Sequence, residues 1–140
     1  MNIVYDELSV SFENPATDPM GYNHVVGKLY CGRDYAELQF KIRDRAFRKT
    51  DPKVVRIEYG EVESVDYSHG WFRPAVLVFE TRSPEKLSEF PGVHVGRVEL
   101  QVISGSRGHA KKVEALIRFK QSEAFLAEAE DRLEGKRSET

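Results

Sequence analysis

The chain has 140 residues, a net charge of -2 at neutral pH, and 40% hydrophobic and 31% charged residues. These values are typical of one globular domain, and they exclude a disordered polyelectrolyte and a second full domain. With 21 Lys and Arg against 23 Asp and Glu, no overall field attracts nucleic acid or an anionic membrane. We therefore expect a single domain over residues 1–140 that folds unaided and stays soluble.

The single cysteine and the N-terminal residues indicate the cellular compartment in which the protein is expected. Cys31 has no second cysteine with which to form an internal disulfide or a multi-thiolate metal site. Residues 1–12 mix charged, polar and apolar side chains and do not resemble a signal peptide. No segment approaches the ~20 apolar residues that span a bilayer. We expect a cytoplasmic protein with no membrane insertion.

Alternation of apolar and polar residues predicts β-strands at 8–12, 25–31 and 36–42. The last of these is the clearest, because every second residue from Ala36 to Ile42 is apolar and the residues between them are charged or polar. One face of this strand should meet the core and the other should meet water. Turn-forming residues at 14–21 separate the first two strands.

Further strands are predicted at 55–57, 62–67, 75–79 and 98–102, which makes about seven in total. Residues 75–79 are apolar on both faces and therefore suit the centre of the fold. A small barrel of this strand number has room inside only for side chains, so we expect no ligand cavity. The side chains predicted to fill the interior are Leu38, Phe40, Ile42, Val76, Val78, Val98, Leu100 and Val102.

After Gly105 the period changes to that of a helix, which Ser106 is placed to cap. Its first apolar stripe consists of Ala110, Val113, Leu116 and Ile117, and this stripe should pack on the barrel. A second stripe consists of Phe125, Leu126, Ala129 and Leu133, and in a continuous helix it would lie roughly opposite the first.

Two arrangements can accommodate the two stripes. Either the chain breaks near residues 120–122 and folds back, or one long helix presents the second stripe to a partner subunit. Neither Gly nor Pro lies between Gly108 and Gly135, so we favour continuity and a symmetric homodimer. Residues 122–140 are then a helical extension that ends in a frayed tail from Glu134.

Three groups of residues carry a family resemblance: Ile57 to Val65, Gly70-Trp71-Phe72, and Val76-Leu77-Val78 with Thr81-Arg82-Ser83. With the order of strands and helix, they resemble the central signature of small bacterial pleckstrin-homology-like (PH-like) domains, over roughly residues 22–118. The resemblance implies a mainly β fold, a bent antiparallel barrel capped by a C-terminal amphipathic helix. It implies no ligand or activity, since the family has no established common function.

A weak anion site is one alternative function. Lys28 with Lys41 and Arg43 loosely fits the spacing of phosphoinositide-binding PH domains, although these side chains are explained equally well as the solvent face of strands. Ser106 and Arg107 open a helix whose free N–H groups could hold a phosphate. Ordinary capping by Ser106 explains the same residues.

The most basic segment is residues 43–49, joined by Lys53 and Arg56. Phe47 could stack on a base there, but Asp44 and Asp51 interrupt the patch. We expect no tight nucleic-acid binding.

The four histidines lack the spacing of metal ligands, and Glu61 and Glu63 form no predicted acid pocket. We predict no catalytic, metal or cofactor residues. The sequence favours a non-catalytic module for protein binding or self-assembly, with an unknown partner. The alternative is a small enzyme built from scattered Glu and His residues.

Overall fold

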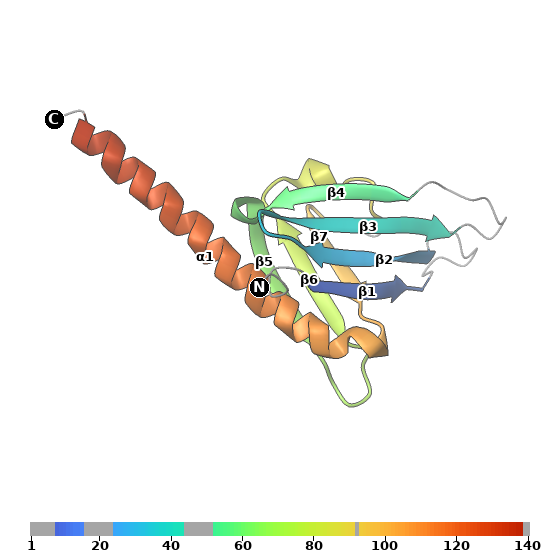
Figure 1. The fold of residues 1–140 in the computed structure, drawn as a ribbon. Coiled ribbons are helices and arrows are strands. Elements are labelled where there is room, and N and C mark those ends of the chain that lie inside the picture. Colours follow the sequence, from blue (N-terminus) through green and yellow to red (C-terminus); the bar gives the residue numbers. More distant parts are fainter. Residues whose placement is uncertain (1–7, 16–23, 44–51, 92, 139–140) are drawn as a thin grey trace.

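The computed structural model describes residues 8–15, 24–43, 52–91 and 93–138. They form seven antiparallel strands in two sheets and one long C-terminal helix (Figure 1). The first sheet has the order β1 (Leu8–Asn14), β2 (His24–Cys31), β3 (Tyr35–Arg43), β4 (Lys53–Glu58). The second has the order β5 (Val62–Ser68), β6 (Val76–Thr81), β7 (Arg97–Gln101). The mainly β prediction with about seven strands is confirmed.

The two sheets meet at one corner and do not close into a barrel. An isolated bridge pairs Phe12 with Val102, just beyond β7. The Asn14 side chain extends this junction, because its Nδ2 donates to the Glu99 carbonyl at 2.7 Å and its Oδ1 accepts the Gln101 N–H at 2.8 Å. At the other edge, the 3₁₀ turn η2 (Tyr59–Glu61) leads from β4 into β5, and the described residues of these two strands form no ladder. The predicted barrel is therefore a bent, open pair of sheets.

Aromatic rings fill the space between the sheets. Phe12, Phe40, Phe79 and Phe90 are among the largest fully buried side chains. Phe90 follows the 3₁₀ turn η3 (Pro84–Leu87), and its ring centroid lies 6.0 Å from that of Phe12 and 5.0 Å from that of Phe40. A side chain from a connecting segment thus closes the core at the side where the two sheets diverge.

The predicted interior is correct in part. Leu38, Phe40, Val98, Leu100 and Val102 are buried, and Ile42 packs against the core while partly exposed. On β6 the assignment of the inner face was wrong. Leu77 and Phe79 are buried there, and Val76 and Val78 are half-buried on the other face. Register explains this, because Leu77 pairs with Leu100 and Phe79 pairs with Val98, both on the inner face of β7.

The helix α1 (Arg107–Ser138) is continuous over 32 residues and follows the 3₁₀ turn η4 (Ser104–Ser106). Its Ala110, Val113 and Ile117 side chains are fully buried, and it packs on β1, β5 and η2. Ser106 was expected to cap the helix, and in the structure its Oγ accepts the Ser11 N–H at 3.1 Å and ties the helix start to β1. The helix includes residues through Ser138, beyond Glu134, where the frayed tail was expected to begin.

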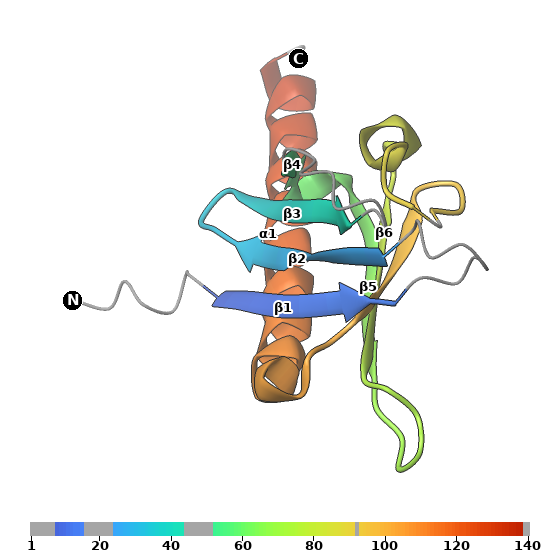
Figure 2. The same ribbon diagram turned by 90° about the vertical axis from the view of Figure 1, so that its right-hand side faces the viewer.

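The C-terminal half of α1 projects away from the sheets, whereas its N-terminal half lies against them (Figures 1 and 2). The loop between β5 and β6 extends from the domain at the other end, near the start of α1. Within the described ranges, no helix combines the length and apolar character needed to cross a bilayer.

Candidate interaction surfaces

The helix leaves the domain near Ala124. Gln121 makes one of the last polar contacts, donating from Nε2 to the Val62 carbonyl at 2.7 Å. A Cβ atom on Gly60 would lie 3.7 Å from the Cβ of Ala124. Beyond this point the side chains predicted for self-association become exposed, with Phe125 at 65%, Leu126 at 59% and Leu133 at 57%, and Ala129 half-buried.

The exposed apolar residues follow a heptad. Phe119, Leu126 and Leu133 are spaced by seven residues, the spacing of an a position in a coiled coil. The small residues Ala115, Ser122 and Ala129 then occupy the d positions. We call these six residues the helix seam. At about 100° per residue the seam lies opposite the buried Val113 and Ile117, as predicted for the second stripe.

Charges flank the helix seam in a regular way. The g positions are occupied by Arg118, Phe125 and Arg132, and the e positions by Glu123 and Glu130. Arg118 already donates to Asp66 Oδ1 at 2.8 Å, but its guanidinium remains on the surface, with 55% of the side chain exposed. Glu123 and Glu130 are exposed and make no ion pair with another described residue.

A cleft of about 420 Å³ lies where the helix leaves the domain. Phe125 and Leu126 form its apolar side, and Gly60 and Arg82 lie on the side of the sheets. The cleft is continuous with the helix seam through Leu126, so an apolar side chain that packs on the seam could also enter it.

The tip of the β5–β6 loop carries the most exposed aromatic residues of the described chain. Trp71 is 97% exposed and Phe72 is 100% exposed. Gly70-Trp71-Phe72 is one of the groups that carry the family resemblance, and neither ring packs on the core. Their position in a short loop between Gly70 and Pro74 is the feature of the sequence that could have predicted this exposure.

The same loop contacts the start of α1. Arg107 Nη1 lies 3.2 Å from His69 Nε2, and a shallow depression lined by Tyr67, Lys111 and Glu114 adjoins this contact. The Tyr67 N–H donates to the Glu114 carboxylate. The base of the hairpin is thereby held against the first turns of the helix.

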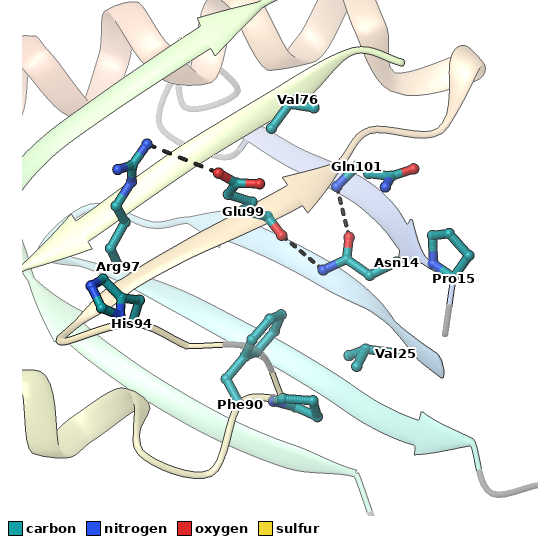
Figure 3. Close-up of a pocket in the computed structure, with 10 residues that line it drawn as sticks. Asn14, Pro15, Val25, Val76, Phe90, His94, Arg97, Glu99 and Gln101 are labelled. Carbon is teal, nitrogen blue, oxygen red and sulfur yellow. Dashed lines mark hydrogen bonds and ion pairs between the residues drawn. The ribbon is translucent and has the colours of Figure 1, made fainter. Parts of the chain in front are cut away.

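A third hollow lies at the corner where the sheets diverge (Figure 3). It measures about 500 Å³, and its residues include Asn14, Phe90, His94 and Arg97. Arg97 approaches Glu99 at 3.9 Å, and Asn14 is held by the β7 backbone. The sequence led us to expect no ligand cavity, and the structure has an open hollow at this corner of the sheets.

The weak anion-binding candidates are divided between two places. Lys28 and Lys41 lie on the outer face of the first sheet, and Arg43 ends β3 with a side chain outside the described residues. Ser106 and Arg107 lie at the start of α1. Among the described residues, no hydrogen bond or ion pair joins either lysine to Ser106 or Arg107. The described candidates thus lie at two separate places, the first sheet and the start of the helix.

The basic segment falls mainly on residues 44–51, which lie outside the described residues. Of its described members, Lys53 forms an ion pair with Glu89, and Arg56 pairs with Glu37 at 3.2 Å. The Arg56 guanidinium also lies 4.8 Å from the centroid of the Tyr35 ring. These two cations are thus paired with carboxylates of their own domain.

The carboxylates considered for acid chemistry are engaged as well. Glu61 accepts hydrogen bonds from Lys86 at 2.8 Å and from Ser83 at 2.7 Å, and these bonds hold the pKa of Glu61 below its usual value. Glu63 accepts from Arg82 at 2.7 Å. A carboxylate with a lowered pKa is ionised at neutral pH and does not serve as a proton donor. In the described part of the chain, no three His, Cys, Asp or Glu residues gather as metal ligands would.

No protein-family model matches the sequence, and no curated protein matches it either. Two surfaces thus stand out by geometry, the helix seam at one end of the molecule and the aromatic loop tip at the other.

Proposed function

We propose that this chain is a non-catalytic self-assembly module that forms a parallel homodimer through the helix seam. The observation that carries the proposal is the exposed heptad of Phe119, Leu126 and Leu133 on a helix that continues beyond its own domain. An exposed apolar stripe of this kind is unusual on a monomer. A second copy of the same helix covers it with matching spacing.

The flanking charges favour a parallel pair over an antiparallel pair. In a parallel coiled coil a g residue faces the e residue five positions later on the partner. This sets Arg118 beside Glu123 of the other helix, Phe125 beside Glu130 and Arg132 beside Arg137, so one pair of like charges is opposed by one pair of opposite charges. In an antiparallel pair g faces g and e faces e, so that Arg118 would approach Arg132 and Glu123 would approach Glu130. Like charges at these positions disfavour that arrangement.

The position of the domain is compatible with pairing along the helix. The buried stripe of Val113 and Ile117 and the helix seam lie on opposite sides of α1. Each domain would therefore sit on the outer side of its own helix, and the two helices would pack back to back along a two-fold axis.

We also propose that the chain is a member of the PH-like family and that it resides in the cytoplasm. Seven antiparallel strands followed by one C-terminal helix is the order on which the resemblance to PH-like domains rests, and it supports membership in that family. The single buried cysteine suits the reducing cytoplasm.

Light scattering coupled to size exclusion tests the oligomeric state. We expect the intact protein to have the mass of a dimer and the Leu126→Glu variant to have the mass of a monomer. The matched control is Ala127→Glu, which adds the same charge one position along, on the exposed side away from the seam. A monomeric intact protein, or a dimeric Leu126→Glu variant, would overturn the proposal.

Orientation is tested separately by oxidation. In a Cys31→Ala background, a Leu133→Cys variant places equivalent thiols face to face at an a position of a parallel pair. We expect an intermolecular disulfide to form readily. In an antiparallel pair these residues lie at opposite ends of the seam, so failure to cross-link would reject the parallel orientation while leaving the dimer in place.

A further inference from the structure

The loop between β5 and β6 presents Trp71 and Phe72 to solvent from a firmly held base. The backbone carbonyl of Ala75, which is fully buried, accepts the Val102 N–H at 2.8 Å. A Cβ atom on Gly70 would lie 3.5 Å from the Cβ of Arg73, so the two residues that flank the aromatic pair lie close together. The rings therefore form the end of a narrow hairpin, and no ring packs on its own domain.

Basic residues lie in the segments next to this tip, and the carboxylate of Glu114, on the helix, accepts the Tyr67 N–H at the base of the loop. Arg73 follows the aromatic pair, and Arg107, Lys111 and Lys112 lie in the first turns of α1. Residues 68–79 and 102–113 contain no Asp or Glu. The contact of 3.2 Å between Arg107 and His69 places the two segments side by side.

The cations at the helix start are unfavourable for the helix itself. The N-terminal end of a helix carries a partial positive charge, which favours acidic residues in the first turn. The first turn of α1 has none and instead begins with Arg107. The partial positive charge of the helix end and the Arg107 guanidinium thus both favour an anion at this point.

We infer that this end of the molecule, the aromatic tip with its basic surround, docks on the surface of an anionic phospholipid membrane. Trp and Phe are suited to the headgroup region, where an apolar ring can be buried at shallow depth. Each cation near an anionic surface strengthens binding by about fivefold. An aromatic wedge and a basic patch together supply the two contributions that stable surface binding needs.

The shape of the tip favours a membrane over a protein partner. Binding hot spots between proteins lie near the centre of a well-packed patch, surrounded by contacts that exclude water. Here two exposed rings belong to a projecting loop, and this loop is the lowest part of the molecule in Figures 1 and 2. A narrow tip reaches a layer of headgroups without needing a complementary hollow. This contact is shallow and differs from the membrane-spanning insertion that the sequence disfavours.

Trp71 is the only tryptophan, so its fluorescence reports directly on the tip. The intact protein is mixed with vesicles of phosphatidylcholine alone and with vesicles that contain about one-third phosphatidylserine. We expect a blue shift of the emission and co-sedimentation with the anionic vesicles, both weakened by added salt. Absence of a blue shift with anionic vesicles would reject the inference.

Variants separate this surface from the other basic residues. Phe72→Ser keeps the reporter and should lower vesicle affinity by about tenfold or more. Lys111→Glu with Lys112→Glu should lower it at least as much. Two controls should bind normally: Val54→Ser, which removes an exposed apolar side chain from β4, and Lys28→Glu with Lys41→Glu on the outer face of the first sheet.

Circular dichroism of each variant confirms that the fold is retained. Full binding by the Phe72→Ser variant would overturn the inference. Loss of binding only in the Lys28→Glu, Lys41→Glu variant would also overturn it, because the contact would then lie on the sheet. Neither result depends on whether the helix seam forms a dimer.

Discussion

A Cβ atom on Gly27 of β2 would lie 2.0 Å from the backbone carbonyl oxygen of Gln39 on β3. Gly27 is the register partner of both Phe12 and Phe40, so it sits at the middle of the first sheet. Backbone cannot move aside as a flexible side chain can, and we expect Gly27→Ala to lower the free energy of unfolding by about 2 kcal/mol or more. Urea denaturation measures this change.

Gly108 provides the control for that substitution. It lies in the first turn of α1, and a Cβ atom there would meet nothing within 4 Å. Alanine is favoured over glycine in helices by up to about 1 kcal/mol, so Gly108→Ala should leave stability unchanged or raise it. Equal losses in the two variants would show that the close approach at Gly27 is not the cause.

Val95 is held in a backbone conformation that valine rarely adopts. His94 and Arg97 exchange both backbone hydrogen bonds, at 3.0 and 3.1 Å, around a two-residue turn with φ of 47° at Val95 and 78° at Gly96. Positive φ at both central positions favours Asn followed by Gly. Because Val95 is 73% exposed, its side chain loses little packing on replacement. We expect Val95→Asn to raise the free energy of unfolding by about 1 kcal/mol.

Val54→Asn is the matched comparison, since Val54 is also an exposed valine but lies in a regular strand, β4. Valine suits a strand better than asparagine, so this change should not stabilise the protein. Thermal unfolding of both variants distinguishes them. A gain in both would point to surface polarity instead of relief of strain at Val95.

The thiol of Cys31 should be unreactive in the folded protein. Cys31 is fully buried, and burial raises the pKa of its thiol from 9.0 to about 12, an effect opposed by a hydrogen bond with Tyr59. The thiolate is the reactive form, so a thiol reagent at mildly alkaline pH should modify Cys31 only as fast as the protein unfolds. Rapid modification without denaturant would contradict this prediction.

The same raised pKa gives a pH dependence of stability. Above pH 9 the unfolded thiol loses its proton while the folded thiol keeps it until about pH 12. The folded state then binds more protons, and the free energy of unfolding falls as pH rises, on the order of 1 kcal/mol per pH unit. Denaturation midpoints of the native protein and of Cys31→Ala should differ in this slope. Equal slopes would contradict the assignment.

Period-two patterning located the strands because each has one buried face. In β3 every second residue from Ala36 to Phe40 is buried, as the alternation indicates. The same method could not choose the inner face of β6, because Val76, Leu77, Val78 and Phe79 are all apolar. Only the register with β7 decides it.

The sequence pattern could not identify residues whose role depends on contacts with segments distant in the sequence. Phe90 lies in a connecting segment and gave no periodic signal, yet it closes the core between Phe12 and Phe40. Asn14 looked like a turn residue, but it bonds to a strand distant in sequence. The exposure of Trp71 and Phe72 could not be predicted either. The sequence indicates a loop at this point but does not show whether other segments cover its side chains.

The second stripe of α1 was predictable because it depends only on helix geometry and on the lack of Gly and Pro after Gly108. Helical spacing placed Phe125, Leu126 and Leu133 away from the domain, and these residues are exposed. The heptad relation of Phe119 to Leu126 is equally a property of the sequence.

Pairing through the helix seam should strengthen membrane docking. In the parallel dimer the two helices start at the same end, so both Trp71 tips face one membrane. Binding of the second tip is then intramolecular, and avidity can raise the apparent affinity by about a hundredfold. We expect Leu126→Glu to weaken binding to phosphatidylserine vesicles by at least about tenfold. The Ala127→Glu variant adds the same negative charge and should bind as the native protein does. If a monomeric Leu126→Glu variant and the native dimer bind vesicles equally well, only one tip of the dimer reaches the membrane. That result would count against a parallel arrangement of the two chains.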